Sequence, residues 1–118
     1  MNGSTPRFLQ GSFPFEGAGL VKPVPVHASL GYVVPAGTST QPVYFRGGNS
    51  SDEMVAVVLV RDGRPMRWFP IGARSATHVS LRVVEDLLAD TRLELHVAAP
   101  EGVSGTLVVD LGLVEVEA

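Results

Sequence analysis

The sequence predicts an all-β domain, an antiparallel β-sandwich or jelly-roll of about seven to eight short strands. Valine occurs nineteen times in 118 residues against one isoleucine, and this stiff β-branched side chain suits a pleated sheet. Thirteen glycines and nine prolines divide the chain into short runs. Residues 77–84 and 91–97 alternate apolar and polar side chains, which is typical of strands with one buried and one wet face.

The first 28 residues differ from the rest, and we predict an extended N-terminal arm over 1–28 followed by a sandwich domain over 29–118. The arm holds four prolines and four glycines and keeps no strand or helix period. It nevertheless carries three of the five phenylalanines, Phe8, Phe13 and Phe15. The arm therefore packs as an irregular edge strand on its own domain or lies on another subunit, with a disordered tail as the third alternative.

The first strands of the domain are expected at 30–34 and 42–46. Residues 54–61 are almost wholly apolar, which indicates a central strand buried on both faces. Asp62 and Gly63 follow at once and precede the run 65–71. An Asp-Gly pair between two such runs predicts a hairpin with a type I′ turn, because both central residues need positive φ.

The second half of the chain supplies the alternating strands 77–84 and 91–97, with a helical turn expected at 85–90 between them. The last strand, 105–117, changes its apolar phase after Gly112. A glycine at such a change predicts a β-bulge or a bend, with Val114 and Val116 taking the opposite parity.

Composition excludes several classes of protein. The absence of cysteine excludes disulfide scaffolds, zinc-thiolate sites and iron–sulfur clusters. No apolar run reaches the ~20 residues of a membrane-spanning helix, and the amino end lacks a secretory signal. A net charge of −3 gives no reason to expect nucleic acid. We expect a cytoplasmic or particle-associated protein without a membrane partner.

Metal ligands are sparse, and no cofactor is expected. His78 and His96 both fall on predicted wet strand faces, and Glu94 could add a carboxylate if those strands were neighbours. They are weak metal candidates, because no short His-x-His spacing exists. The loop 49–53 offers hard oxygen ligands for calcium but lacks the EF-hand pattern.

No catalytic constellation stands out, so we expect no enzyme. The Gly-x-Ser-x-Gly motif is absent, and Ser80 beside His78 is an ordinary pair of strand neighbours. The acidic pairs 52–53 and 85–86 are sequential, so their members point in different directions. A small enzyme that uses two converging carboxylates remains a third hypothesis.

Charge is distributed unevenly along the sequence. Residues 61–84 carry a net +4 and residues 85–118 a net −7, whereas residues 1–60 are neutral. Antiparallel strands could interleave these charges harmlessly. If they separate in space, the molecule has a basic hairpin and an acidic flank, which would steer association.

We therefore expect a non-catalytic structural or accessory protein that docks on a larger assembly or on copies of itself, as an accessory subunit or as a capsid or shell decoration. The expected partner is a protein or a second copy of the chain. The interaction candidates are Phe8, Phe13, Phe15, Arg61, Arg64, Arg67 and Trp68.

The alternative is a ligand-binding β-sandwich module for carbohydrate or a divalent metal. Tyr44, Phe45, Trp68 and Phe69 are the aromatic candidates, and alternation exposes one ring of each adjacent pair. This alternative predicts an exposed Trp68 or Tyr44, or a clustered pair of His78 and His96.

Overall fold

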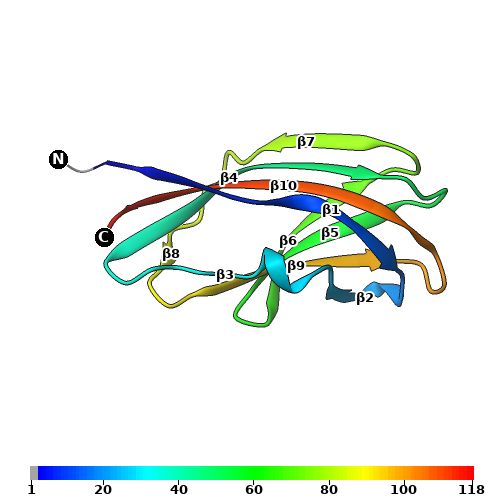
Figure 1. Cartoon of the computed structure of the whole chain (residues 1–118), viewed down its shortest axis with the longest axis horizontal. Coiled ribbons are helices and arrows are strands. Elements are labelled where there is room, and N and C mark those ends of the chain that lie inside the picture. Colours follow the sequence, from blue (N-terminus) through cyan, green and yellow to red (C-terminus); the bar gives the residue numbers. More distant parts are fainter. Residues whose placement is uncertain (1–2) are drawn as a thin grey trace.

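The computed structural model describes residues 3–118, and it is an elongated sandwich of two antiparallel sheets (Figure 1). This confirms the predicted fold class, with ten strands. The first sheet has the order β1-β10-β4-β7, with β8 paired to β4: β1 (Thr5–Glu16), β10 (Ser104–Glu117), β4 (Thr38–Asn49), β7 (Ala76–Ser80) and β8 (Leu87–Leu88). The second has the order β2-β9-β5-β6, with β3 paired to β9: β2 (Gly19–Pro25), β9 (Arg92–Ala99), β5 (Val55–Arg61), β6 (Arg64–Ile71) and β3 (Tyr32–Val33).

The core lies between the sheets and is filled by alternate side chains of each strand. Phe45 of β4 and Phe69 of β6 stack across it, with ring centroids 4.4 Å apart and an interplanar angle of 8°. The two sheets are thus joined by an aromatic pair, while alternate side chains of β4, such as those of Tyr44 and Arg46, lie on its outer face.

The described part of the N-terminal arm supplies one strand to each sheet. β1 pairs with β10 from Thr5 to Glu16, and Leu9 and Phe15 are buried in the core. β2 pairs with β9 in the second sheet. The arm lies on its own domain because its alternate apolar residues complete the core.

The hairpin between β5 and β6 has the predicted geometry. Asp62 has φ 48° and Gly63 has φ 80°, so both turn residues lie in the left-handed region as a type I′ turn requires. β5 lies between β9 and β6, which confirms that it is a central strand.

The helical turn expected at 85–90 is wrong. Residues 87–88 form β8, and Leu87 is buried in the core whereas Leu88 is exposed. A six-residue segment gains little from helical hydrogen bonds, so burial of one leucine in an extended segment decides its conformation. Within residues 3–118 the helical structure is the 3₁₀ turn η1 (Ala28–Leu30), which replaces the start of the strand expected at 30–34. No helix there is long and apolar enough to cross a membrane.

The bulge predicted at Gly112 is present, but its extra residue belongs to β4. Gly112 pairs with Tyr44 and Leu113 pairs with Pro42, so Val43 is the inserted residue. β10 consequently keeps its phase, and Glu115 faces inward with 6% of its surface exposed. The expected phase change on β10 is therefore wrong, because the partner strand absorbs the shift.

Candidate functional site

An open groove of about 570 Å³ crosses the outer face of the first sheet, the face that points away from the second sheet. It runs over β4, β7 and β10, which lie side by side in Figure 1. Gly48 leaves the end of β4 without a side chain there, and Val108 forms an apolar wall. The groove is lined by Arg46, Gly47, Gly48, Ala76, Thr77, His78, Val108 and Asp110.

The polar side chains of the groove form one row across three strands. Asp110 of β10 pairs with Arg46 of β4, and Arg46 pairs with His78 of β7. Arg46 and His78 are exposed, and Asp110 is half-buried. No carboxylate of residues 3–118 lies within ion-pair distance of Arg46, so its guanidinium keeps its donors free for a ligand.

Tyr44, one row further along β4, holds this row in place. Its hydroxyl donates to the Asp110 carboxylate, with both oxygens at 3.1 Å. The Cζ atom of Arg46 lies 5.1 Å from the centroid of the Tyr44 ring. The His78 ring contacts the Tyr44 ring edge-on, with the two ring centroids 6.2 Å apart. Burial, and then the hydrogen bond to Asp110, raises the pKa of Tyr44, which keeps its hydroxyl a donor.

The ring of Tyr44 lies directly over Gly112. A Cβ atom at Gly112 would lie 2.0 Å from Cε2 of the ring, far inside van der Waals contact. The glycine that the sequence marks as a change of phase therefore makes room for the tyrosine that organises the groove.

The groove combines several donors and acceptors with an apolar surface. The guanidinium of Arg46 is a planar fork of donors, the Asp110 carboxylate accepts, and the His78 imidazole can do either. Val108, 51% exposed, offers a surface for C–H groups. Such a set fits a ligand that carries several hydroxyl groups on a ring, since each hydroxyl both donates and accepts.

The three phenylalanine candidates of the arm have different surroundings. Phe8 is exposed on β1, and Phe15 is buried in the core. Phe13 is half-buried and stacks on His27, with ring centroids 4.8 Å apart. The structure does not bring the three together as one surface.

The candidates of the β5–β6 hairpin also separate. The Nε of Arg67 donates to Glu85 at 3.0 Å, so this arginine is engaged within the chain. Arg61 and Arg64 are exposed beside the turn. Trp68 is exposed on the outer face of the second sheet, opposite to the groove.

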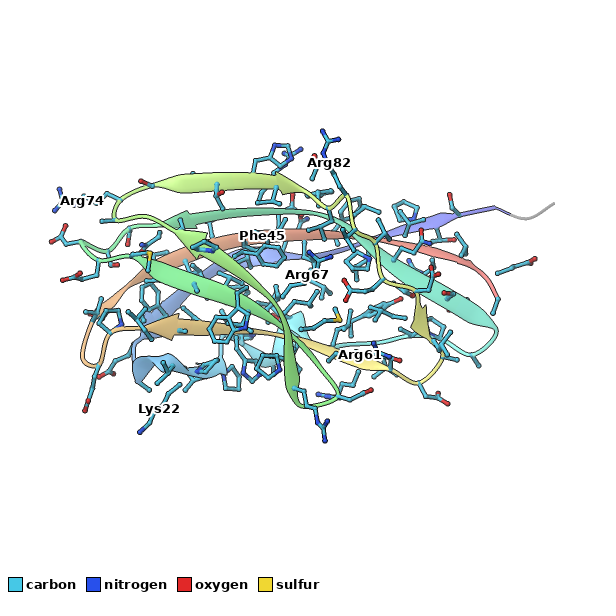
Figure 2. All side chains as sticks on the ribbon, turned by 180° about the vertical axis from the view of Figure 1, so that it is seen from behind. Lys22, Phe45, Arg61, Arg67, Arg74 and Arg82 are labelled. Atoms are coloured by element: carbon cyan, nitrogen blue, oxygen red, sulfur yellow. The ribbon has the colours of Figure 1, made fainter. Side chains whose placement is uncertain are left out.

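Ion pairs join the charged segments of the sequence to one another and to residues 1–60, and Arg67–Glu85 links the basic segment 61–84 to the acidic segment 85–118. Figure 2 shows the labelled cationic residues spread over different ends of the molecule. Four arginines form ion pairs: Arg7 with Glu115, Arg67 with Glu85, Arg74 with Asp52, and Arg92 with Glu94 two residues further along the chain.

The weak metal candidates do not meet. His78 lies on β7 of the first sheet and His96 on β9 of the second, where its Nε2 is 3.4 Å from Glu94. Residues 3–118 contain no group of three or more histidine, aspartate or glutamate side chains placed to hold a metal ion.

The loop 49–53 is held by its own hydrogen bonds. The side-chain nitrogen of Asn49 donates to the carbonyl oxygens of Glu53 at 2.8 Å and Gly72 at 3.1 Å. Its side-chain oxygen accepts from the backbone and the hydroxyl of Ser51. The Asn49 amide group thus holds together the loop that was considered above as a source of oxygen ligands for calcium.

Sequence reasoning did not single out Arg46 or Asp110. Both occupy outward positions of strands, where charged side chains are ordinary. The available signal was Gly112 between two leucines, together with the adjacent glycines Gly47 and Gly48 near the end of β4. It becomes readable only when the register of β4 and β10 is known.

Three carbohydrate-binding modules share this fold. The CBM36-1 domain of a multidomain xylanase from the hindgut metagenome of Trinervitermes trinervoides gives a TM-score of 0.57 at 16% identity, over 93% of this chain and 96% of that chain. A family 35 carbohydrate-binding module from Clostridium thermocellum gives 0.52 at 14%, over 92% and 97%. The module CBM36, solved in complex with calcium and xylotriose, gives 0.51 at 17%, over 96% and 99%.

Sequence comparison adds no family. No protein-family model matches the chain, and no curated protein matches it by sequence. The structure of infectious bursal disease virus Gx strain also contains the fold, with a TM-score of 0.52 at 9% identity over 97% of this chain, but over only 32% of that chain. At these identities the likeness establishes the shared fold.

These findings correct the expected function. A structural or accessory protein that docks on a larger assembly or on itself is the wrong expectation, because three neighbours matched along nearly their whole length are carbohydrate-binding modules. The expectation of a protein partner or a homo-oligomer is wrong on the same ground. The alternative, a ligand-binding β-sandwich module, is the better supported interpretation.

Proposed function

We propose that this chain is a carbohydrate-binding module and that the groove on the first sheet holds the sugar. The observation that carries the proposal is the row of Asp110, Arg46 and His78 beside the glycine floor of an open groove. The fold shared with three carbohydrate-binding modules supports it.

Each group of the groove has a distinct part in the proposed binding. Arg46 donates through its fork to two adjacent hydroxyls, and Asp110 accepts from a third. The apolar C–H side of the sugar ring packs on Val108. The open shape of the groove allows an extended chain to pass through, so an internal segment of a polysaccharide is the ligand that we propose.

We propose binding without bond cleavage. Hydrolysis of a glycosidic bond by the usual route needs two carboxyl groups on either side of the bond. Asp110 is the one acidic residue that lines the groove, and its carboxylate already accepts from Tyr44. The chain would therefore hold a polysaccharide rather than cut it.

The test is titration of the protein with a panel of soluble neutral polysaccharides, including xylan, by isothermal calorimetry. Arg46→Ala should lower the affinity for the bound member at least tenfold, because it removes the free donors of the groove. Asp110→Ala should lower it as well, by removing the acceptor and releasing Tyr44. Both changes are at surface positions, so the fold should survive.

Val83→Ala is a matched control, since Val83 is an exposed side chain outside the groove. It should bind as the parent chain does. Binding that survives both groove substitutions, or a parent chain that binds no member of the panel, would reject the proposed site.

A further inference from the structure

The N-terminal strand β1 extends the outer face that carries the groove. β1 pairs with β10 along its whole length and lies beside it in Figure 1. Leu9 and Phe15 of β1 are buried in the core, so the alternation of side chains places Phe8, Gln10 and Ser12 on the outer face. The lining of the groove comes from β4, β7 and β10. β1 is therefore a fourth strand of this face, with side chains that the proposed groove does not use.

The register places Gln10 at the end of the polar row. Gln10 is the Cα partner of Asp110, which pairs in turn with Arg46. The row thus runs without interruption across four strands. The Gln10 side chain is exposed, and its amide group both donates and accepts. Because neighbouring strands lie about 4.8 Å apart, this amide can reach a second hydroxyl of a sugar that Asp110 holds.

Phe8 lies one step beyond the polar row, on the side away from the groove. It is the Cα partner of Gly112 and lies two residues before Gln10 on β1. Gly112 has no side chain, and the ring of Tyr44 lies over it. The neighbouring position of β10 therefore places no side chain of its own against Phe8, and 52% of the surface of Phe8 is exposed.

Phe8 and Val108 are exposed apolar side chains on opposite sides of the polar row. Val108 lies two residues before Asp110, and the partner of Phe8 lies two residues after it. From the spacings along and between strands, the Cα atoms of Phe8 and Val108 lie on the order of 14 Å apart. One sugar ring is too short to contact both side chains. A chain of sugars laid across the polar row can contact both.

We propose that Phe8 and Gln10 form a second subsite of this face, for another ring of the polysaccharide that the groove holds. The inference rests on the proposed function. The phenyl ring stacks on the C–H side of the sugar ring, and the Gln10 amide bonds one of its hydroxyls. This arrangement fits an extended chain of β-1,4-linked pyranoses with equatorial substituents, because such rings present C–H groups on their flat sides.

The test measures how affinity depends on chain length, by isothermal calorimetry with cellobiose, xylobiose, cellohexaose and xylohexaose. The parent chain should bind at least one hexasaccharide tenfold more tightly than the matching disaccharide. Phe8→Ala and Phe8→Leu should each weaken hexasaccharide binding at least fivefold and disaccharide binding less than twofold. Phe8→Trp should keep the parent affinity, because it restores an aromatic face that leucine lacks.

Leu20→Ala is the matched control, since it also truncates a half-exposed apolar side chain, on β2 of the second sheet. It should change either affinity less than twofold. Thermal unfolding checks that each variant is folded, and Phe8→Leu keeps the test valid if Phe8→Ala does not fold.

Several outcomes would overturn the subsite. These are an unchanged hexasaccharide affinity in Phe8→Leu, an equal loss in Leu20→Ala, an equal loss for the disaccharide, or a parent chain that binds neither hexasaccharide. Arg46→Ala should weaken disaccharide binding, which Phe8→Ala leaves intact. A loss through Arg46→Ala alone would therefore keep the groove and reject the subsite, and a loss through Phe8→Ala alone would reject the groove.

Discussion

Replacing Gly112 by alanine tests how the groove is built. The new Cβ would lie 2.0 Å from Cε2 and 2.5 Å from Cδ2 of Tyr44, so the ring has to move by about 1.5 Å to reach ordinary contact. A shift of that size breaks the 3.1 Å hydrogen bonds from Tyr44 to Asp110. It also removes the ring from beneath Arg46.

Two opposing contributions set the change in unfolding free energy of the Gly112→Ala protein. Alanine in place of glycine within a strand gains about 0.5–1 kcal/mol from the smaller entropy of the unfolded chain. Loss of a hydrogen bond to a charged acceptor costs about 1.5–3 kcal/mol. The net loss of unfolding free energy is therefore about 1–2 kcal/mol, or roughly 4–8 °C in Tm for a domain of this size.

Gly48→Ala is the matched control, since it also places an alanine on the outer face of the first sheet. Its Cβ would have Val108 at 3.8 Å as the one neighbour within 4 Å, so it should keep or raise the stability. Urea unfolding followed by Trp68 fluorescence measures both variants. A Gly112→Ala protein as stable as Gly48→Ala, with its sugar binding intact, would refute the role assigned to Tyr44.

Further predictions concern the hydrogen bonds and the core. The hydroxyl of Tyr32 donates to Glu115 at 2.5 Å, and burial, then this bond, raises the pKa of Tyr32 to about 12. Because the folded pKa lies above the unfolded value of 10.0, its stabilisation is complete below pH 10 and is lost as the pH rises through 12. Absorbance titration at alkaline pH should show tyrosine ionising late in the native protein, and ionisation at the ordinary value would contradict this. Glu115→Ala removes the acceptor that Tyr32 and Arg7 share, with Thr40 remaining as a partner of the Tyr32 hydroxyl, and should cost about 2 kcal/mol in urea unfolding, whereas Glu117→Ala, at an exposed position, should cost little. Phe45→Ala removes a fully buried ring stacked at the centre of the core and should cost about 3–5 kcal/mol, and a loss below 1 kcal/mol would contradict the packing described.

Local patterns predicted the elements whose own residues decide their structure. The Asp-Gly turn was predicted from turn chemistry, β5 from its nearly unbroken apolar run and β9 from two-residue alternation, since each depends on neighbours in the sequence. The segment 85–90 was mistaken for a helical turn because a core contact of Leu87 overrides its local preference.

The sequence by itself determined that this is a β-sandwich, since strand periodicity, turn residues and composition are local properties. Only the tertiary structure decided which outward side chains meet, because Asp110, Arg46 and His78 are brought together by register between strands far apart in the chain. The same holds for Glu115, whose burial follows from an inserted residue in the neighbouring strand rather than from its own surroundings in the sequence.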